Sequence, residues 1–242
     1  MPIESERVEY SAGSTVMKSF ISKPEKVDFS HPGVLVFPEW WGLTDYLELR
    51  AQKLAELGYV AMAVDMYGEG KIASNPADAG SLMNGVLSKM QEGEARVLAA
   101  MEFLKDQDEV DANRLGAIGY CFGGAIVLHA ARKGWPLRAV ASFHGALGPN
   151  HQAESGDVQT KILVCHGEAD AMVTSDNVLE FSREMDRLGA EYVIKTYPDA
   201  LHGFTNPATT ALGQKYGIPV GYNEAADLQS WEELKDFLGK HL

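Results

Sequence analysis

The chain has little cysteine, a deficit of cations and no long apolar run. Its 242 residues include only two cysteines, Cys121 and Cys165, which is not the pattern of a disulfide-held secreted fold. Lysine and arginine number 21 against 34 aspartates and glutamates, and the formal charge of -13 disfavours nucleic acid and anionic lipid as partners. No uncharged apolar run approaches the roughly 20 residues of a membrane-spanning helix, and the N-terminus lacks the features of a signal peptide. We therefore expect a cytoplasmic protein that binds neither nucleic acid nor membranes.

What is present favours one sizeable core. Hydrophobic residues make up 45% of the chain and charged residues 23%, which fits a single α/β domain over residues 1–242. Short apolar runs alternate with amphipathic segments, and the runs are too continuous for a sheet with one solvated face. We expect a mostly parallel central sheet with helices on both faces. The predicted strands are 34–38, 59–64, 115–119, 139–143, 161–165 and 192–197.

Start and stop signals place the helices. The predicted helices are 45–57, with Thr44 as its cap, then 86–105, 122–133 and 175–188. Ser230-Trp231-Glu232-Glu233 has the form of a capping box for a last helix. About the first 30 residues have the pattern of an antiparallel hairpin. Residues 66–85 and 203–229 are rich in Gly, Pro, Asn and Thr and are predicted to be loops over a binding cleft.

Residues 115–124, Leu-Gly-Ala-Ile-Gly-Tyr-Cys-Phe-Gly-Gly, form the most informative motif. An apolar run leads into a cysteine flanked by glycines two residues on either side, and a helical segment follows. A strand that turns directly into a helix strains its apex residue and crowds its neighbours, so only glycine fits beside it. The apex sulfur would stand at the positive end of the helix, which favours the thiolate. The motif predicts that Cys121 is a nucleophile.

Such a thiol needs a base and a group that orients the base. Asp170 follows the predicted strand 161–165, and His202 follows the predicted strand 192–197, so both are expected at the same edge of a parallel sheet. The order Cys121, Asp170, His202 is the order of nucleophile, acid and histidine in α/β-hydrolases. Asp199 and Asp176 are alternatives for the acid. Asp199 is too close to His202 in sequence to support it easily, and Asp176 fits a helix-start charge.

Four motifs together resemble the dienelactone hydrolase family, and the resemblance covers nearly the whole chain. They are Pro38-Glu39-Trp40-Trp41-Gly42, Gly-Tyr-Cys-Phe-Gly-Gly, His-Gly-Glu-Ala-Asp and His-Gly-Phe. The resemblance implies an α/β-hydrolase fold and a Cys-Asp-His triad that hydrolyses lactones or esters without metal or organic cofactor. It also implies that the backbone N–H groups of Trp40 and Phe122 form the oxyanion hole, and that Glu39 holds the resting thiol until substrate displaces it.

The chain departs from the family where substrate is bound. Members that cleave dienelactone hold its carboxylate with arginines, one of them a few residues after the catalytic histidine. This chain has Phe204-Thr205-Asn206-Pro207 there, and no arginine lies between Arg50 and Arg96. Lys71 and Lys89 are the only cations in the loop region concerned, and lysine lacks the bidentate fork of arginine.

Chemistry suggests the substrate class independently. A thiolate leaves more readily than an alkoxide, so its adduct goes forward only when the substrate also has a good leaving group, as in enol esters, activated lactones and thioesters. Aromatic residues predicted near the cleft suggest a flat apolar ligand. They are Trp40, Trp41, Tyr67 and Phe204.

Other candidate residues have plainer interpretations. A metal site from His166, Asp170 and His202 has no supporting ligand spacing. Cys165 is expected to be buried and inert, and His129 and His144 to be core or cleft-wall residues. We expect a monomer or small homo-oligomer that hydrolyses small esters or lactones through a thioester. The alternatives are a non-catalytic ligand-binding or redox-sensing protein on the same fold, or an acyltransferase.

Overall fold

The structure, a computed structural model, describes residues 1–25, 30–149 and 151–242. Two compact units make up the chain, residues 1–117 and 118–242. The single domain over residues 1–242 therefore stays a prediction. Among the described residues, no helix combines the length and apolarity needed to cross a bilayer.

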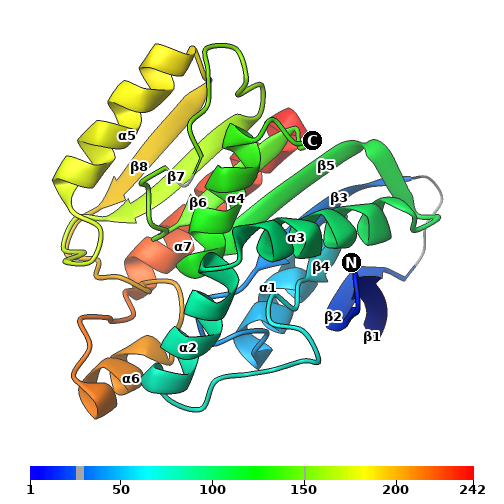
Figure 1. Cartoon of the computed structure of the whole chain (residues 1–242), viewed down its shortest axis with the longest axis horizontal. Helices are drawn as coiled ribbons and strands as arrows, with labels where there is room; N and C mark the ends of the chain where they lie inside the picture. The colour runs from blue at the N-terminus through cyan, green and yellow to red at the C-terminus, as the bar shows by residue number, and fades with distance from the viewer. Residues whose placement is uncertain (26–29, 150) are drawn as a thin grey trace. The chain divides into compact units, whose positions relative to one another are not determined.

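The first unit contains the amino-terminal hairpin and the first parallel strands (Figure 1). Its elements are β1 (Ile3–Ala12), β2 (Thr15–Pro24), β3 (His31–Phe37), α1 (Asp45–Glu56), β4 (Val60–Ala63), α2 (Pro76–Leu87), α3 (Met90–Lys105) and most of β5 (Val110–Tyr120). β2 pairs antiparallel with β1 and with β4, whereas β3 and β4 are parallel. The predicted hairpin is confirmed over residues 3–24; residues 26–29 lie outside the described part of the chain.

The second unit contains the end of β5 and the later parallel strands. Its elements are α4 (Phe122–Arg132), β6 (Ala139–Phe143), β7 (Lys161–Gly167), α5 (Ser175–Leu188), β8 (Tyr192–Tyr197), α6 (Thr209–Tyr216) and α7 (Glu224–His241). β6, β7 and β8 are parallel neighbours. α4 and α5 lie on one face of these strands and α7 on the other (Figure 1). The hydrogen-bonded strand order is β1-β2-β4-β3-β5-β6-β7-β8, which confirms a mostly parallel α/β sheet.

Strands β4 and β6 bury both faces, as their unbroken apolar sequences require, whereas β1 and β8 keep exposed residues. Every residue of β4 and of β6 is buried. Helix α5 has the predicted bounds, because Asn177 accepts a hydrogen bond from the Thr174 backbone N–H at 2.9 Å and Gly189 ends the helix with φ of +70°. The carboxyl ends of β7 and β8 thus lead directly into the loops that carry the predicted acid and histidine.

Some predictions about helices are wrong. The segment 86–105 is interrupted near Lys89, and a separate helix, α2, occupies 76–87 within the predicted loop 66–85. Helix α2 begins at Asn75, whose side chain accepts hydrogen bonds from the N–H groups of Ala77 and Asp78 at 3.0 Å, and a proline follows at the first position.

The last helix begins earlier than its sequence suggested. Asn223 caps α7 by accepting a hydrogen bond from the Ala226 N–H at 3.1 Å. Ser230 lies inside the helix and donates to the Asp227 carbonyl at 3.0 Å, so no capping box forms there. The predicted loop 203–229 therefore contains α6 and the start of α7. At α1, Thr44 takes the N-cap position, but its side chain makes no capping hydrogen bond.

Candidate active site

Cys121 stands between β5, which ends at Tyr120, and α4, which begins at Phe122. Its φ of +53° and ψ of -111° are unusual for a residue with a side chain, and such strain persists only where the surroundings enforce it. The Cys121 N–H donates to the Phe143 carbonyl on β6 at 3.0 Å, which fixes the backbone at the corner. The residue is partly exposed.

Two glycines make this corner possible. A Cβ at Gly119 would lie 2.1 Å from the Gly123 carbonyl oxygen, because the chain folds back on itself around Cys121. A Cβ at Gly124 would lie 2.7 Å from the Ser142 hydroxyl and 2.8 Å from the Gly145 Cα. The glycines are therefore required by close backbone approach. The turn leaves the Phe122 N–H at the first position of α4, where helix N–H groups favour negative charge.

Asp170 follows β7 and is held by its own loop. Its Oδ1 accepts hydrogen bonds from the N–H groups of Met172 at 2.8 Å and Val173 at 3.0 Å. Its Oδ2 accepts the Nδ1–H of His202 at 2.8 Å, and its side chain has no exposed surface. Burial raises the pKa of Asp170, but the hydrogen bond and charge of His202 and the two N–H groups outweigh it and lower the pKa. Asp170 is thus an ionised, fixed acceptor.

His202 follows β8 and is buried. Burial lowers its pKa, but the charge of a Cys121 thiolate, the hydrogen bond to Asp170 and the Asp170 charge together raise the pKa to about 10. Its Nε2 is buried and makes no hydrogen bond among the described residues, so the Cys121 sulfur acts on the ring mainly through its charge. Hydrogen bonds of this kind are often long before substrate binds. The second unit thus brings the Cys121 sulfur and the Asp170 carboxylate to the same imidazole, that of His202.

Comparisons with known proteins show the family to which the chain belongs. The dienelactone hydrolase family matches residues 17–242. The chain belongs to the dienelactone hydrolase family. A protein of Aquifex aeolicus with the provisional name carboxymethylenebutenolidase is 31% identical over 241 residues, which cover 97% of this chain and 98% of that protein. Protein usf of Aquifex pyrophilus is 30% identical over 205 residues, which cover 82% of this chain and 86% of that protein.

Solved structures extend the similarity. The crystal structure of a dienelactone hydrolase-like promiscuous phosphotriesterase from metagenomic libraries matches with a TM-score of 0.92 and 33% identity, covering 99% of this chain and 98% of that chain. A structure from Klebsiella pneumoniae, 21% identical, shares the fold with a TM-score of 0.81 and covers 99% of this chain and 100% of that chain. The α/β-hydrolase fold is therefore confirmed, and the family is one of hydrolases.

The residues predicted for thiol gating, the oxyanion hole and the substrate pocket of this dienelactone hydrolase family member lie in both units. Glu39 and Trp41 are buried in the first unit, and Trp40 is half-buried. Tyr67 is also buried, and its hydroxyl donates to the Trp40 carbonyl at 2.8 Å. Phe204, in the second unit, has no exposed surface. Contact of these aromatic residues with substrate stays a prediction.

His144 is a residue of this site that the sequence placed only as a core or cleft-wall histidine. It follows β6 with φ of +41°, and its ring lies 5.2 Å from the His202 ring in an edge-to-face arrangement. Its Nε2 is hydrogen bonded to the Thr205 hydroxyl at 2.9 Å, and the Phe204 ring packs against it at 5.2 Å. The segment after His202 therefore supports a second imidazole. No sequence spacing indicated this, because β6 and residue 205 are far apart in the chain.

The segment 204–207 provides no cation. Thr205 is buried and bonded to His144, and Asn206 is buried and accepts a hydrogen bond from the Ala208 N–H at 3.0 Å. Both side chains are neutral and bonded within the unit. Within residues 1–25, 30–149 and 151–242, no cluster of three or more His, Cys, Asp or Glu could hold a metal ion.

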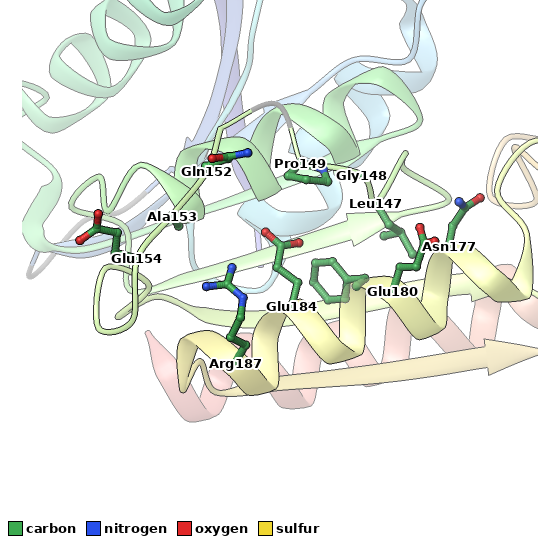
Figure 2. Close-up of a pocket in the computed structure, with 11 residues that line it drawn as sticks. Leu147, Gly148, Pro149, Gln152, Ala153, Glu154, Asn177, Glu180, Glu184 and Arg187 are labelled. Atoms are coloured by element: carbon green, nitrogen blue, oxygen red, sulfur yellow. The ribbon is translucent and has the colours of Figure 1, made fainter.

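A cavity of about 620 Å³ lies elsewhere in the second unit, between α5 and the loop after β6. Figure 2 shows Glu180, Glu184 and Arg187 of α5 on one side of it and Gln152 on the other. Next to it, Glu184 accepts two hydrogen bonds from the buried Arg132, at 2.9 and 2.7 Å. Cys121, Asp170 and His202 do not line this cavity.

Proposed function

We propose that the protein hydrolyses carboxylic esters or lactones, with Cys121 as the nucleophile and a thioester as the intermediate. One observation supports this above all. Within residues 118–242, the sulfur of Cys121 stands at a strained corner next to His202, whose Nδ1–H donates to Asp170 at 2.8 Å. Nucleophile, base and orienting acid are the parts that acyl transfer requires.

The proposed reaction has two steps. The Cys121 thiolate attacks the acyl carbon, and the carbon–oxygen bond of the leaving group breaks while His202 gives that oxygen a proton. Water then attacks the thioester, His202 takes the proton of the water, and the carbon–sulfur bond breaks to release the acid. Asp170 keeps the imidazole in the tautomer that both steps need.

The negative oxygen of each tetrahedral intermediate needs hydrogen-bond donors. We propose the Phe122 N–H as one donor, because it lies at the first position of α4. The second donor, the Trp40 N–H, is proposed from the family resemblance, as is the role of Glu39 in holding the resting thiol. We further propose that activated leaving groups are preferred, because a thiolate is expelled more readily than an alkoxide.

The two cysteines provide a matched experiment. We expect Cys121→Ala to lower turnover of p-nitrophenyl acetate by about 10³-fold or more, as loss of a triad nucleophile does. Cys165 is fully buried, and burial raises its pKa to about 12, so Cys165→Ala should keep most of the activity. Intact mass spectrometry at short times should find one acetyl group on the wild-type protein and on Cys165→Ala only. Near-wild-type turnover in Cys121→Ala would reject the proposal.

The same measurements separate the alternatives. No acyl adduct with any activated ester, together with reversible oxidation of Cys121, would favour a ligand-binding or redox-sensing protein. An acyl adduct that an added alcohol or amine accepts faster than water would favour an acyltransferase. A phosphotriester belongs in the screen because the structure that is 33% identical is named as a promiscuous phosphotriesterase.

We propose a cytoplasmic setting and a small-molecule substrate. The two thiols are both free in the structure, which suits a reducing compartment. A monomer or small homo-oligomer without nucleic-acid or membrane partners remains part of the proposal, and it rests on the acidic composition of the chain.

A further inference from the structure

Residues 39–42 form a turn in the first unit that fixes the direction of one amide. The Gly42 N–H donates to the Glu39 carbonyl at 3.1 Å, and Gly42 has φ of +92°. A trans peptide places its N–H opposite its carbonyl. Because the Glu39 carbonyl points into the turn, the Trp40 N–H of the same peptide points out of it. Among the described residues, this N–H has no backbone acceptor.

The loop after β4 holds this turn from one side. The Tyr67 hydroxyl donates to the Trp40 carbonyl at 2.8 Å, and the Ala73 N–H donates to the Trp41 carbonyl at 2.9 Å. Together with the bond to Glu39, all three carbonyls of residues 39–41 are engaged. The contact is also close, because a Cβ at Gly42 would lie 2.7 Å from the Lys71 carbonyl oxygen. The turn cannot rotate without breaking these contacts.

Asp65 fixes the loop that follows β4. This carboxylate is 1% exposed, and its Oδ1 accepts hydrogen bonds from the N–H groups of Tyr67 at 2.9 Å and Gly68 at 2.8 Å. Its Oδ2 accepts hydrogen bonds from the N–H groups of Gly70 at 2.8 Å and Lys18 on β2 at 3.0 Å. A buried carboxylate that accepts four N–H groups is a rigid anchor, since releasing any of them leaves a buried polar group unpaired.

We infer that Asp65 and Tyr67 form a brace that positions the Trp40 amide as an oxyanion donor. The inference rests on the proposed function, in which that amide is the second donor. Asp65 fixes the loop, the loop places the Tyr67 hydroxyl, and the hydroxyl fixes the peptide that follows Trp40. Oxyanion donors act because they are held in place before charge develops. Tyr67 and Asp65 are therefore positioning residues, and Tyr67 works through its hydroxyl.

The test compares two reactions of the same sulfur. Hydrolysis of p-nitrophenyl acetate passes through an oxyanion, whereas alkylation of Cys121 by iodoacetamide does not. Tyr67→Phe removes only the hydroxyl. We expect its kcat for the ester to fall by roughly tenfold, less than the loss of about 10²-fold or more for removal of a whole donor, while KM changes by less than about twofold. The alkylation rate of Cys121 should remain that of the wild type.

A second variant and a control make the result specific. In Gly42→Ala the added Cβ would clash with the Lys71 carbonyl oxygen and displace the turn. This variant should therefore also lose ester hydrolysis while it keeps the alkylation rate of Cys121. Tyr59→Phe removes the hydroxyl of another buried tyrosine of the same unit, and among the described residues this hydroxyl makes no hydrogen bond to the turn. It should leave both reactions unchanged.

The outcomes distinguish the brace from the proposed function. Wild-type kcat in Tyr67→Phe, with an active wild-type enzyme, overturns the brace and leaves the proposed function standing. Equal losses of hydrolysis and alkylation also overturn it, because Tyr67 would then support the thiol or the fold. A wild-type protein that forms no acyl-enzyme removes the proposed function and the brace together.

Discussion

At the scale of single residues, the electrostatics of the site depend on a buried imidazole between two groups that can carry negative charge. Burial alone would keep His202 neutral, and Asp170 with a Cys121 thiolate reverses that effect and raises the pKa to about 10. Below that pH the ring is an imidazolium, which is the form that donates a proton to a leaving group. In the proposed reaction, this is the form that the first chemical step requires.

Asp170→Asn tests this balance. The variant removes both the charge and the accepting carboxylate, so the pKa of His202 should fall from about 10 toward the ordinary value, and kcat should fall by at least about tenfold. NMR titration of labelled histidines, with the signal assigned by His202→Gln, measures the midpoint. Asp176→Asn is a control, because Asp176 only adds charge to the first turn of α5. An unchanged His202 midpoint in Asp170→Asn would show that the carboxylate does not support the imidazolium.

At the scale of elements, short sequence motifs predicted the turns and helix ends that neighbouring residues determine. The glycines around Cys121 predicted the corner, and the signals at Thr174 and Gly189 predicted α5 to the residue. The pair Asp170 and His202 could be found because each follows a parallel strand, and such strand ends meet at one edge.

Sequence patterns that occur in more than one structural setting gave wrong helix boundaries. Ser230 has the pattern of a cap but lies inside α7, since Asn223 already caps the helix seven residues earlier. Contacts between distant loops gave no sequence signal at all. The contact of His144 with Thr205 and the hydroxyl of Tyr67 on the Trp40 carbonyl depend on tertiary placement, so they were visible only in the structure.

The corner at Cys121 also permits a prediction about stability. Gly119→Ala would bring a Cβ within 2.1 Å of backbone at Gly123, and backbone cannot move aside as a flexible side chain can. We expect the free energy of unfolding to fall by about 3 kcal/mol or more. Gly85→Ala in α2 is the matched control, because nothing lies within 4 Å of its Cβ and alanine favours a helix. Equal stabilities of the two variants in urea unfolding would contradict the crowded corner.

At the scale of the whole molecule, the net charge leads to an expectation about the substrate. The chain carries a formal charge of -13, and residues 204–207, which follow His202, include no cation. The nearby Thr205 and Asn206 are bonded within their own unit. The field of such a protein repels anions, and no bidentate arginine in this segment compensates for that repulsion. We therefore expect a substrate with a free carboxylate to approach the protein more slowly, and to bind less tightly, than a neutral substrate.

Two p-nitrophenyl esters of equal chain length test this, one ending in a methyl group and the other in a carboxylate. Given esterase activity, we expect kcat/KM for the charged ester to be lower by about tenfold at an ionic strength of about 0.01 M, where the Debye length is about 30 Å. Raising the salt to about 0.1 M shortens that length to about 10 Å, so the difference should narrow while the neutral ester is unaffected. A charged ester that reacts faster, and that salt slows, would instead reveal a cationic clamp supplied by other residues, with Lys71 and Lys89 the first to replace by glutamine.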